Sequence, residues 1–172
     1  ISCYGGSNGS LSVSTTGGNT GNVIYTWNTG QSSSSTSINN LSAATYVVVA
    51  TDVLGCMDTT DYTVTQPELL EANIFDVDIT DVLCFGESTG EITVTVNGGS
   101  VNVNNQYTYS WTPNIGNATT NYDFVTSIGT GTYSDLDTGI YQVVVTDVNN
   151  CTATSNMVYV AQPTNPLSIF TD

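Results

Sequence analysis

The chain has 172 residues, a formal net charge of −15, and no lysine, arginine or histidine. A surface of this charge repels nucleic-acid phosphates and anionic lipids, so we expect neither a nucleic-acid partner nor membrane binding. Without histidine or lysine, the Ser-His-Asp triad, the phosphate-binding loop and most general bases that work near neutral pH are missing, so we expect no enzyme. No run approaches 18 apolar residues, which excludes membrane insertion of this segment.

The first part of the chain contains four runs typical of short β-strands. They read SLSVST, VIYTWN, TYVVVATD and DYTVTQ, at residues 10–15, 23–28, 45–52 and 61–66. The runs are rich in valine, threonine and tyrosine, and glycine-, asparagine- and serine-rich turns separate them. No helical period is visible. A run of β-strands with 39% hydrophobic residues predicts a folded, all-β protein.

The second part of the chain repeats the same plan. CYGGSNGSLSV from Cys3 corresponds to CFGESTGEITV from Cys84, and YVVVATDVLGC from Tyr46 corresponds to YQVVVTDVNNC from Tyr141. Each copy closes with Gln-Pro, at residues 66–67 and 162–163. We therefore expect one repeat over residues 1–67, a second over 68–163 with an insertion at about 112–134, and the start of a further repeat over 164–172. Such an array is expected to be a piece of a longer protein.

Each copy has the pattern of an immunoglobulin-like, Greek-key β-sandwich. A strand with a tryptophan (Trp27, Trp111) precedes a Leu-x-x-[AG]-x-Tyr corner and a valine-rich strand. Strand alternation predicts that Tyr141, Val143 and Val145 point into the core. We expect the aspartates that follow the valine-rich strands to accept hydrogen bonds from turn amides, with metal binding there as the alternative.

The cysteines are predicted to pair within each copy. If the first cysteine of a copy begins the first strand of a seven-strand sandwich, the turn after the sixth strand lies at the same end of the sandwich. The second cysteine lies in that turn, so we predict the pairs Cys3–Cys56 and Cys84–Cys151. Such bonds imply an oxidising, extracellular location; free thiols in a cytosolic protein are the alternative. Seven antiparallel strands also place the two ends of a copy at opposite poles, so we expect the copies to stack end to end as a disulfide-stapled rod.

These motifs resemble the SprB-type repeat of very large surface proteins of gliding Bacteroidota. The matching patterns are C-[YF]-G-x-x-x-G, Y-x-W and L-x-x-[AG]-x-Y-x-V-x-x-T-D-x-x-[GN]-C. The resemblance implies a secreted filamentous adhesin, exported by the type IX route, that takes part in surface attachment, gliding or cell–cell contact. It implies neighbouring repeats or subunits, and a surface polysaccharide, as partners.

Two further sites are hypotheses from the residues. Asp76, Asp78 and Asp81, with Glu68 or Glu71, could bind Ca²⁺; an edge strand protected by negative charge is the alternative. No other cofactor is expected. Tyr122, Phe124 and Tyr133 of the insertion could contact a glycan or a protein. The chain is thus either a structural spacer or a binding module that uses this loop.

Overall fold

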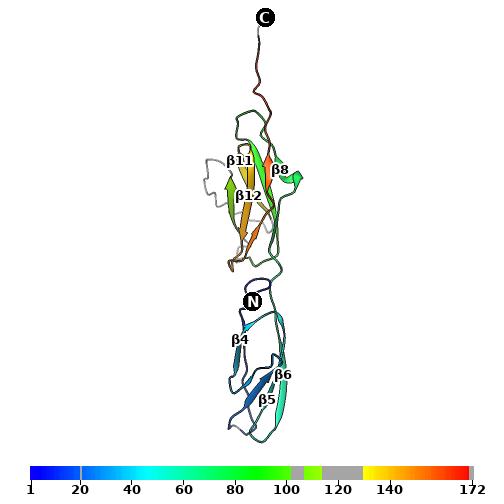
Figure 1. The fold of residues 1–172 in the computed structure, drawn as a ribbon, viewed down its shortest axis with the longest axis vertical. Coiled ribbons are helices and arrows are strands. Elements are labelled where there is room, and N and C mark those ends of the chain that lie inside the picture. Colours follow the sequence, from blue (N-terminus) through cyan, green and yellow to red (C-terminus); the bar gives the residue numbers. More distant parts are fainter. Residues whose placement is uncertain (20, 102–106, 114–129, 171–172) are drawn as a thin grey trace. The chain divides into compact units, whose positions relative to one another are not determined.

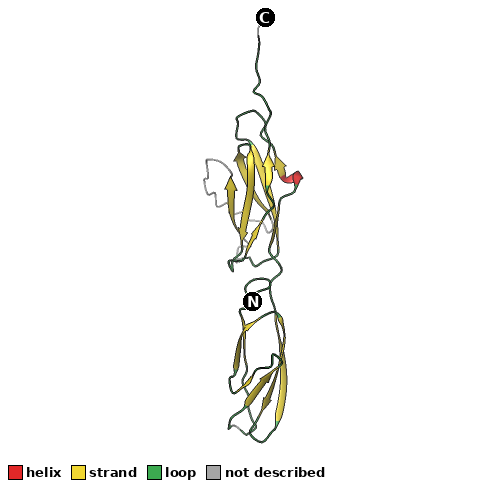
Figure 2. Ribbon diagram, in the orientation of Figure 1, coloured by secondary structure: helices red, strands yellow, loops and turns green. Residues whose placement is uncertain are grey.

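The computed structural model describes residues 1–19, 21–101, 107–113 and 130–170, and it divides into two compact units. Unit 1 comprises Ile1–Pro67 and unit 2 comprises Glu68–Asp172. The described residues form β-strands and one short 3₁₀ segment (Figures 1 and 2). No helix among them has the length and apolar character needed to cross a bilayer. Both units are two-layered β-sandwiches, as the sequence predicts.

Unit 1 consists of a two-stranded and a four-stranded sheet. The small sheet pairs β1 (Gly9–Ser12) with β4 (Ser37–Leu41), and the large sheet has the order β3-β2-β5-β6. The strands of the large sheet are β2 (Ile24–Trp27), β3 (Ser32–Ser33), β5 (Ala44–Thr51) and β6 (Met57–Val64). All pairs are antiparallel. Ile38 and Leu41 of the small sheet pack with Trp27 and Val48 of the large sheet in one core.

Unit 2 consists of two four-stranded sheets. In one sheet, β9 (Gly90–Asn97) pairs on one side with β11 (Thr130–Leu136) and on the other with β7 (Glu71–Asn73) and β8 (Ile79–Thr80). In the other, β12 (Gly139–Thr146) pairs with β10 (Thr108–Pro113), β13 (Thr152–Thr154) and β14 (Val158–Val160). The 3₁₀ segment η1 (Asp76–Asp78) separates β7 from β8.

The valine-rich strands anchor both cores in the predicted orientation. In β12, Tyr141 is 6% exposed and Val143 and Val145 are 0% exposed, while the residues between them are only partly buried. The hydroxyl of Tyr141 donates to the Asp137 carbonyl oxygen at 2.9 Å, and that of Tyr46 donates to Ser42 in the same way. Both tyrosine corners are therefore confirmed, and they tie the start of each valine-rich strand to the preceding turn.

The predicted cysteine pairs are wrong. Cys56 and Cys84 carry free, exposed thiols, whereas Cys3 and Cys151 take part in disulfide bonding. In unit 1, the Gly5 amide next to Cys3 donates to the Gln66 side chain, and the Ile1 amino group donates to the Thr65 carbonyl. Cys56 lies just before the other end of β6, whose 8 residues span about 26 Å. Cys3 and Cys56 therefore lie at opposite poles of unit 1.

The wrong cysteine pairs arise because the prediction did not include one strand. The prediction took the run after the first cysteine as the first strand, but unit 2 shows that a strand precedes it, formed by β7 and β8. The run after the cysteine is thus the second strand and runs in the opposite direction. In unit 2 the Gly86 amide donates to the Gln162 side chain, so Cys84 lies beside the end of the repeat, away from Cys151.

Candidate functional site: an open groove in unit 1

The two units differ at the strand that follows the first cysteine. In unit 2, β9 has hydrogen-bonded neighbours along both edges, namely β11 on one side and β7 with β8 on the other. Its counterpart in unit 1, β1, pairs only with β4 among the described strands. One edge of β1 therefore presents unpaired backbone groups, which is the arrangement that accepts an additional strand.

The burial of the aligned residues differs between the two units in the same way. In unit 2, Leu70, Ala72 and Ile74 on and beside β7 are 4–7% exposed, and they cover Ile92 and Val94 of β9, which are 0% exposed. When Cys3 is aligned with Cys84, Ile92 and Val94 correspond to Leu11 and Val13. Leu11 and Val13 are only partly buried. Leu11 and Val13 of unit 1 are therefore less buried than Ile92 and Val94 of unit 2.

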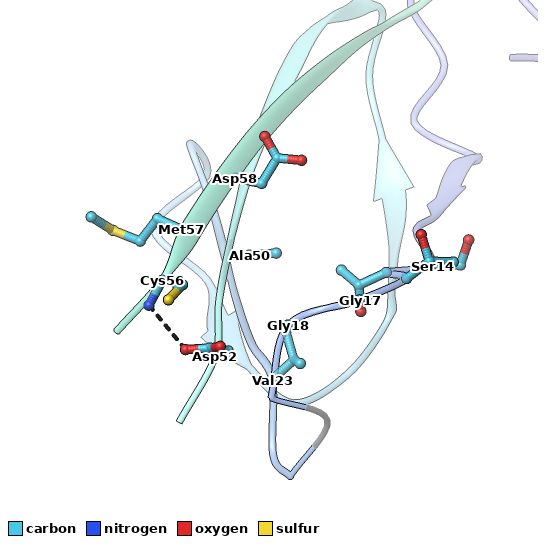
Figure 3. Close-up of a pocket in the computed structure, with 11 residues that line it drawn as sticks. Ser14, Gly17, Gly18, Val23, Ala50, Asp52, Cys56, Met57 and Asp58 are labelled. Atoms are coloured by element: carbon cyan, nitrogen blue, oxygen red, sulfur yellow. Dashed lines mark hydrogen bonds between the residues drawn. The ribbon is translucent and has the colours of Figure 1, made fainter. Parts of the chain in front are cut away.

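The uncovered edge forms a groove in unit 1 between residues 10–18 and residues 56–62. Three cavities of about 500, 70 and 350 Å³ follow one another along it and share lining residues. Its floor is formed by side chains of the large sheet, among them Tyr25, Trp27, Tyr46 and Val48. Figure 3 shows the third cavity, with Ser14, Gly17 and Gly18 on one wall and Cys56, Met57 and Asp58 on the other. We call this feature the β1–β6 groove.

Two features of the groove are the exposure of its β6 wall and an unpartnered nitrogen on its floor. Strand β6 has 8 residues, and seven of them, all but Val64, are exposed. Tyr62, for example, is 63% exposed, although Val158 at the aligned position of unit 2 is only 8% exposed. On the floor, the Trp27 indole is 3% exposed, and its Nε1 has no hydrogen-bond partner among the described residues. A buried donor without a partner is costly, so this nitrogen favours a ligand that brings an acceptor.

In each unit, one aspartate near one end of the sandwich accepts hydrogen bonds from backbone amides. In unit 1, Asp52 Oδ1 accepts hydrogen bonds from the amides of Leu54 and Cys56, both at 2.9 Å, and its Oδ2 accepts from the Asn19 amide at 3.0 Å. These bonds to the ionised form lower the pKa of Asp52, with the Asn19 amide as the largest cause.

In unit 2, Asp147 accepts three backbone hydrogen bonds in the same arrangement. Its Oδ1 accepts from the amides of Asn149 and Cys151, and its Oδ2 accepts from the Ser100 amide. The prediction that both aspartates hold turn amides is confirmed. Each carboxylate therefore ties the turn after the valine-rich strand to the loop that follows β1 or β9.

A pair of glycines lies at this same end in each unit. Gly98 and Gly99 of unit 2 both have positive φ, and a Cβ on Gly98 would overlap the Leu69 carbonyl oxygen of the chain entering β7. Gly17 and Gly18 correspond to them and have the same sign of φ, but a Cβ on Gly17 would meet nothing within 4 Å. Gly17 thus shares the sign of φ with Gly98 but not the close contact with a neighbouring backbone.

The acidic residues proposed for Ca²⁺ lie in and after η1. Asp76 and Asp78 lie in η1, where they do not alternate on one strand face as predicted, and Asp81 accepts a hydrogen bond from the Ala161 amide at 2.8 Å. Across the part of the chain that the structure describes, no group of three or more acidic or cysteine side chains is close enough to share a metal ion. Calcium binding by Asp76, Asp78 and Asp81 stays a prediction.

The proposed binding loop is described only at its ends. Tyr122 and Phe124 lie outside the described residues, as does most of the insertion predicted at about 112–134. Tyr133 belongs to β11, is 6% exposed and stacks on Trp111 with ring centroids 5.2 Å apart. Its hydroxyphenyl ring is part of the core of unit 2, so the prediction that Tyr133 contacts a ligand is wrong. Trp27 is buried in the core of unit 1, and Trp111 is partly buried against the core of unit 2.

The groove itself was missed by the sequence reasoning. One signal could have found it, because Ile-Phe recurs after each Gln-Pro, at residues 74–75 and 169–170. This recurrence places an apolar segment before the second cysteine-led copy, where Leu70, Ala72 and Ile74 are buried on and beside β7.

The chain is similar to one family of repeats. Residues 1–32 and 77–115 match the family model described as the SprB repeat, which confirms the resemblance for one segment in each unit. The matched segments include the cysteine-led turn, β1 and β2 of unit 1, and β9 and β10 of unit 2. No curated protein matches the chain.

Solved structures that match the chain have low overall similarity to it. A "Biofilm associated protein - BSP domain" is 15% identical with a TM-score of 0.33; the match covers 91% of this chain and 27% of that one. The chicken CNTN1 FN1-FN3 domains are 14% identical with a TM-score of 0.31, covering 83% of this chain and 55% of that one. Drosophila OTK extracellular domains 3-5 are 12% identical with a TM-score of 0.27, covering 77% and 50%. The chain therefore spans about a quarter to a half of the length of these structures.

Proposed function

We propose that this chain is a structural repeat segment of a secreted, filamentous bacterial surface adhesin. In this role the β-sandwich units are spacers that transmit mechanical load between a cell and the surface or cell to which it attaches, including during gliding. The proposal depends on one observation. Both units contain SprB-type repeat sequence, and their cores are built in the same way. The proposal assigns no catalytic step to the chain.

The path of the backbone through unit 2 supports a spacer role. The Glu68 carbonyl accepts a hydrogen bond from the Gly99 amide at one pole, beside Asp147, whereas Gln162 contacts Gly86 at the other. The chain thus enters and leaves unit 2 at opposite poles, separated by the length of β9. A force applied to the two ends acts along the strands, and antiparallel hydrogen bonds then resist it together.

Composition and cysteine chemistry support an extracellular location. Disulfide bonding at Cys3 and Cys151 requires an oxidising compartment. A net charge of −15 without any cationic side chain keeps neighbouring chains apart at low ionic strength and favours solubility outside the cell.

The proposal is tested on intact cells of the bacterium that encodes the chain. Fab fragments raised against the 172-residue chain should label filaments outside unpermeabilised cells in immunogold electron microscopy. A strain that lacks the gene provides the labelling control, and it should attach less well to glass or to other cells. Labelling that appears only after permeabilisation would contradict the surface assignment, and normal attachment by the deletion strain would contradict the adhesin role.

A further inference from the structure

We propose that Cys84 forms a disulfide bond with Cys56 of a second copy of this chain, so that copies become covalently joined head to tail. Each unit has a leading cysteine, Cys3 or Cys84, before the strand β1 or β9. Each unit also has a trailing cysteine, Cys56 or Cys151, in the turn after its valine-rich strand. The inference goes beyond the proposed function, because it concerns how one copy is bonded to another.

The two cysteines of one unit lie too far apart to bond with each other. In unit 2, Cys84 lies before β9 on the side of Gln162, whereas Cys151 shares the Asp147 carboxylate with Ser100, which follows β9. The 8 residues of β9 span about 26 Å, but the Cα atoms of a disulfide lie within about 7 Å of each other. In unit 1 the length of β6 separates the two cysteines in the same way. The partner of each free thiol therefore lies outside its own unit.

The free leading cysteine has the same backbone surroundings as the bonded one. Cys3 is disulfide-bonded and Cys84 is free. In each turn, the amide of the third residue after the cysteine donates to the cysteine carbonyl, at 3.0 and 3.2 Å. The glycine between them has a φ of 72° or 78°, and its amide donates to the side chain of the glutamine that closes the unit. Cys84 is therefore held in the turn of a cysteine that forms a disulfide.

The trailing cysteines share a second turn. Cys151 is disulfide-bonded and Cys56 is free. The amide of each donates to Oδ1 of the aspartate four residues before it, at 2.9 Å for Cys56 (Figure 3) and 2.8 Å for Cys151. Its carbonyl accepts from the amide of that aspartate, at 2.9 and 3.0 Å. The residue just before the cysteine has positive φ in both turns, 86° at Gly55 and 64° at Asn150. Cys56 is thus also presented as a bonded cysteine is.

The bonding state of the four cysteines indicates which kinds pair. One leading and one trailing cysteine are disulfide-bonded, and one leading and one trailing cysteine are free. Disulfide bonding in this chain therefore uses one cysteine of each kind. The two free thiols are again one of each kind, so a bond between Cys84 of one copy and Cys56 of another repeats the same combination.

Both free thiols lie among exposed apolar side chains. Leu83, beside Cys84, is 72% exposed, and Leu54 and Met57, near Cys56, are 74% and 71% exposed. Because a disulfide brings its two cysteines within about 7 Å, these side chains would meet and lose contact with water, which stabilises the bonded form.

The bond requires an oxidant, and we assign this role to a disulfide of low molecular mass such as oxidised glutathione. The Cys84 thiolate attacks a sulfur of the oxidant, forms a mixed disulfide and releases one glutathione thiolate. The Cys56 thiolate of the second copy then attacks the Cys84 sulfur and displaces the other glutathione thiolate. The two cysteine thiols lose two electrons and two protons, and the oxidant is reduced to two thiols.

The first experiment mixes the variants Cys56→Ser and Cys84→Ser in equal amounts in a glutathione redox buffer. Each variant keeps one free thiol, so three disulfide-linked dimers are possible, and ¹⁵N labelling of one variant separates them by intact mass. The dimer that joins Cys84 to Cys56 should exceed either dimer of like thiols at least about tenfold. Random proportions of the three dimers, an excess of a dimer of like thiols, or no dimer would overturn the proposal. Peptide maps verify that Cys3 and Cys151 take no part in the new bonds.

A further substitution tests the contact around the bond. Leu54→Ser, made in the Cys84→Ser chain, removes an apolar side chain beside Cys56 and should lower the yield of the mixed dimer about threefold or more. Val77→Ser in the same chain is the control, because Val77 is 91% exposed and belongs to η1 of unit 2. Equal yields from the two variants would overturn the proposed approach of Leu54 to the partner.

The chain without substitutions tests the head-to-tail arrangement. Each copy has one thiol of each kind, so oxidation should produce a series of covalent oligomers in a non-reducing gel, whereas Cys56→Ser or Cys84→Ser alone can form no species larger than a dimer. Absence of species larger than a dimer from the unsubstituted chain would overturn the arrangement.

Discussion

Gly98 lies so close to Leu69 that a Cβ on Gly98 would overlap the Leu69 carbonyl oxygen. At Gly17, the corresponding glycine of unit 1, the same Cβ would meet nothing within 4 Å. Both glycines have positive φ, 71° and 79°. The comparison isolates the effect of the strand, since the backbone conformation is shared and only the neighbour differs.

Substitution of these glycines by alanine is expected to have unequal effects. Gly17→Ala should destabilise unit 1 by about 1 kcal/mol, the cost of a left-handed conformation for a residue with a Cβ. Gly98→Ala adds the overlap with Leu69 and should cost unit 2 at least about 2 kcal/mol. Urea unfolding followed by hydrogen–deuterium exchange and mass spectrometry resolves the two units. Equal losses in the two variants would contradict the close contact of Gly98 with the chain that enters β7.

Asp147→Asn is expected to weaken unit 2. Asp147 is 5% exposed, and its carboxylate accepts three backbone hydrogen bonds, at 2.8, 2.8 and 2.9 Å. The amide keeps a single acceptor oxygen, so at least one buried donor loses its partner, at a cost of about 1–3 kcal/mol. The same unfolding measurement checks this, with Asp135→Asn as the control at an exposed aspartate of the same unit. An unchanged midpoint for Asp147→Asn would show that these bonds add no net stability.

Acid is expected to destabilise unit 1 through Asp52. Its pKa in the folded state is lowered from 3.8 by the amides of Asn19, Cys56 and Leu54. A lowered folded-state pKa means that the stabilisation is fully present above the pKa of the unfolded chain, near 4, and is lost as pH falls through the lower folded value. Unit 1 of Asp52→Asn should therefore show a weaker dependence of unfolding on pH below about 4. If unfolding of unit 1 depends on pH below about 4 in the same way in the native chain and in Asp52→Asn, this role of Asp52 is excluded.

Alternation and local motifs made the strands of each unit predictable. The inward face of β12 and both tyrosine corners depend on residues within a few positions of one another, such as Tyr141 and Asp137, and short-range patterns report such contacts well. The equivalence of the two halves followed from the cysteine-led and tyrosine-led motifs, whose residues occupy matching places in both sandwiches.

Strand order was the property that local patterns could not supply. The segment Leu70–Asn73 is short and contains glutamate and asparagine, so it reads as a linker, yet Leu70 and Ala72 are buried against β9. Missing this strand reversed the direction of the next one and moved each predicted cysteine partner to the wrong pole. The same omission concealed the groove, because the edge of β1 that lines it could not be located without the strand order.

Free thiols at Cys56 and Cys84 are expected to react with alkylating agents without prior reduction. Both thiols are exposed. Iodoacetamide added to the unreduced, native chain should modify these two cysteines and neither Cys3 nor Cys151, which are disulfide-bonded. Intact mass and peptide mapping measure the modification, and the Cys56→Ser and Cys84→Ser variants should each lose one adduct. A native chain that takes up no label would restore the pairs Cys3–Cys56 and Cys84–Cys151.

Alkali is expected to unfold unit 2 through its buried tyrosines. Burial raises the pKa of Tyr109 to about 12, and the neighbouring Tyr107 contributes to the rise. Because an unfolded tyrosine ionises near 10, the unfolded state releases its proton first as pH rises. A raised folded-state pKa leaves stability intact below about pH 10 and removes it progressively as pH approaches the folded value.

The alkaline transition is measured by phenolate absorbance together with hydrogen exchange of β12. Tyr109→Phe removes one ionisable group from the core of unit 2, so the free energy of unfolding of that unit should fall less steeply between about pH 10 and 12. Tyr107, Tyr133 and Tyr141, whose pKa values burial also raises, retain part of the slope. Tyr4→Phe, at a residue 54% exposed in unit 1, is the control for loss of a hydroxyl. A slope for unit 2 that is unchanged by Tyr109→Phe would show that Tyr109 ionises alike in the folded and unfolded chain, and its ring would then have access to water.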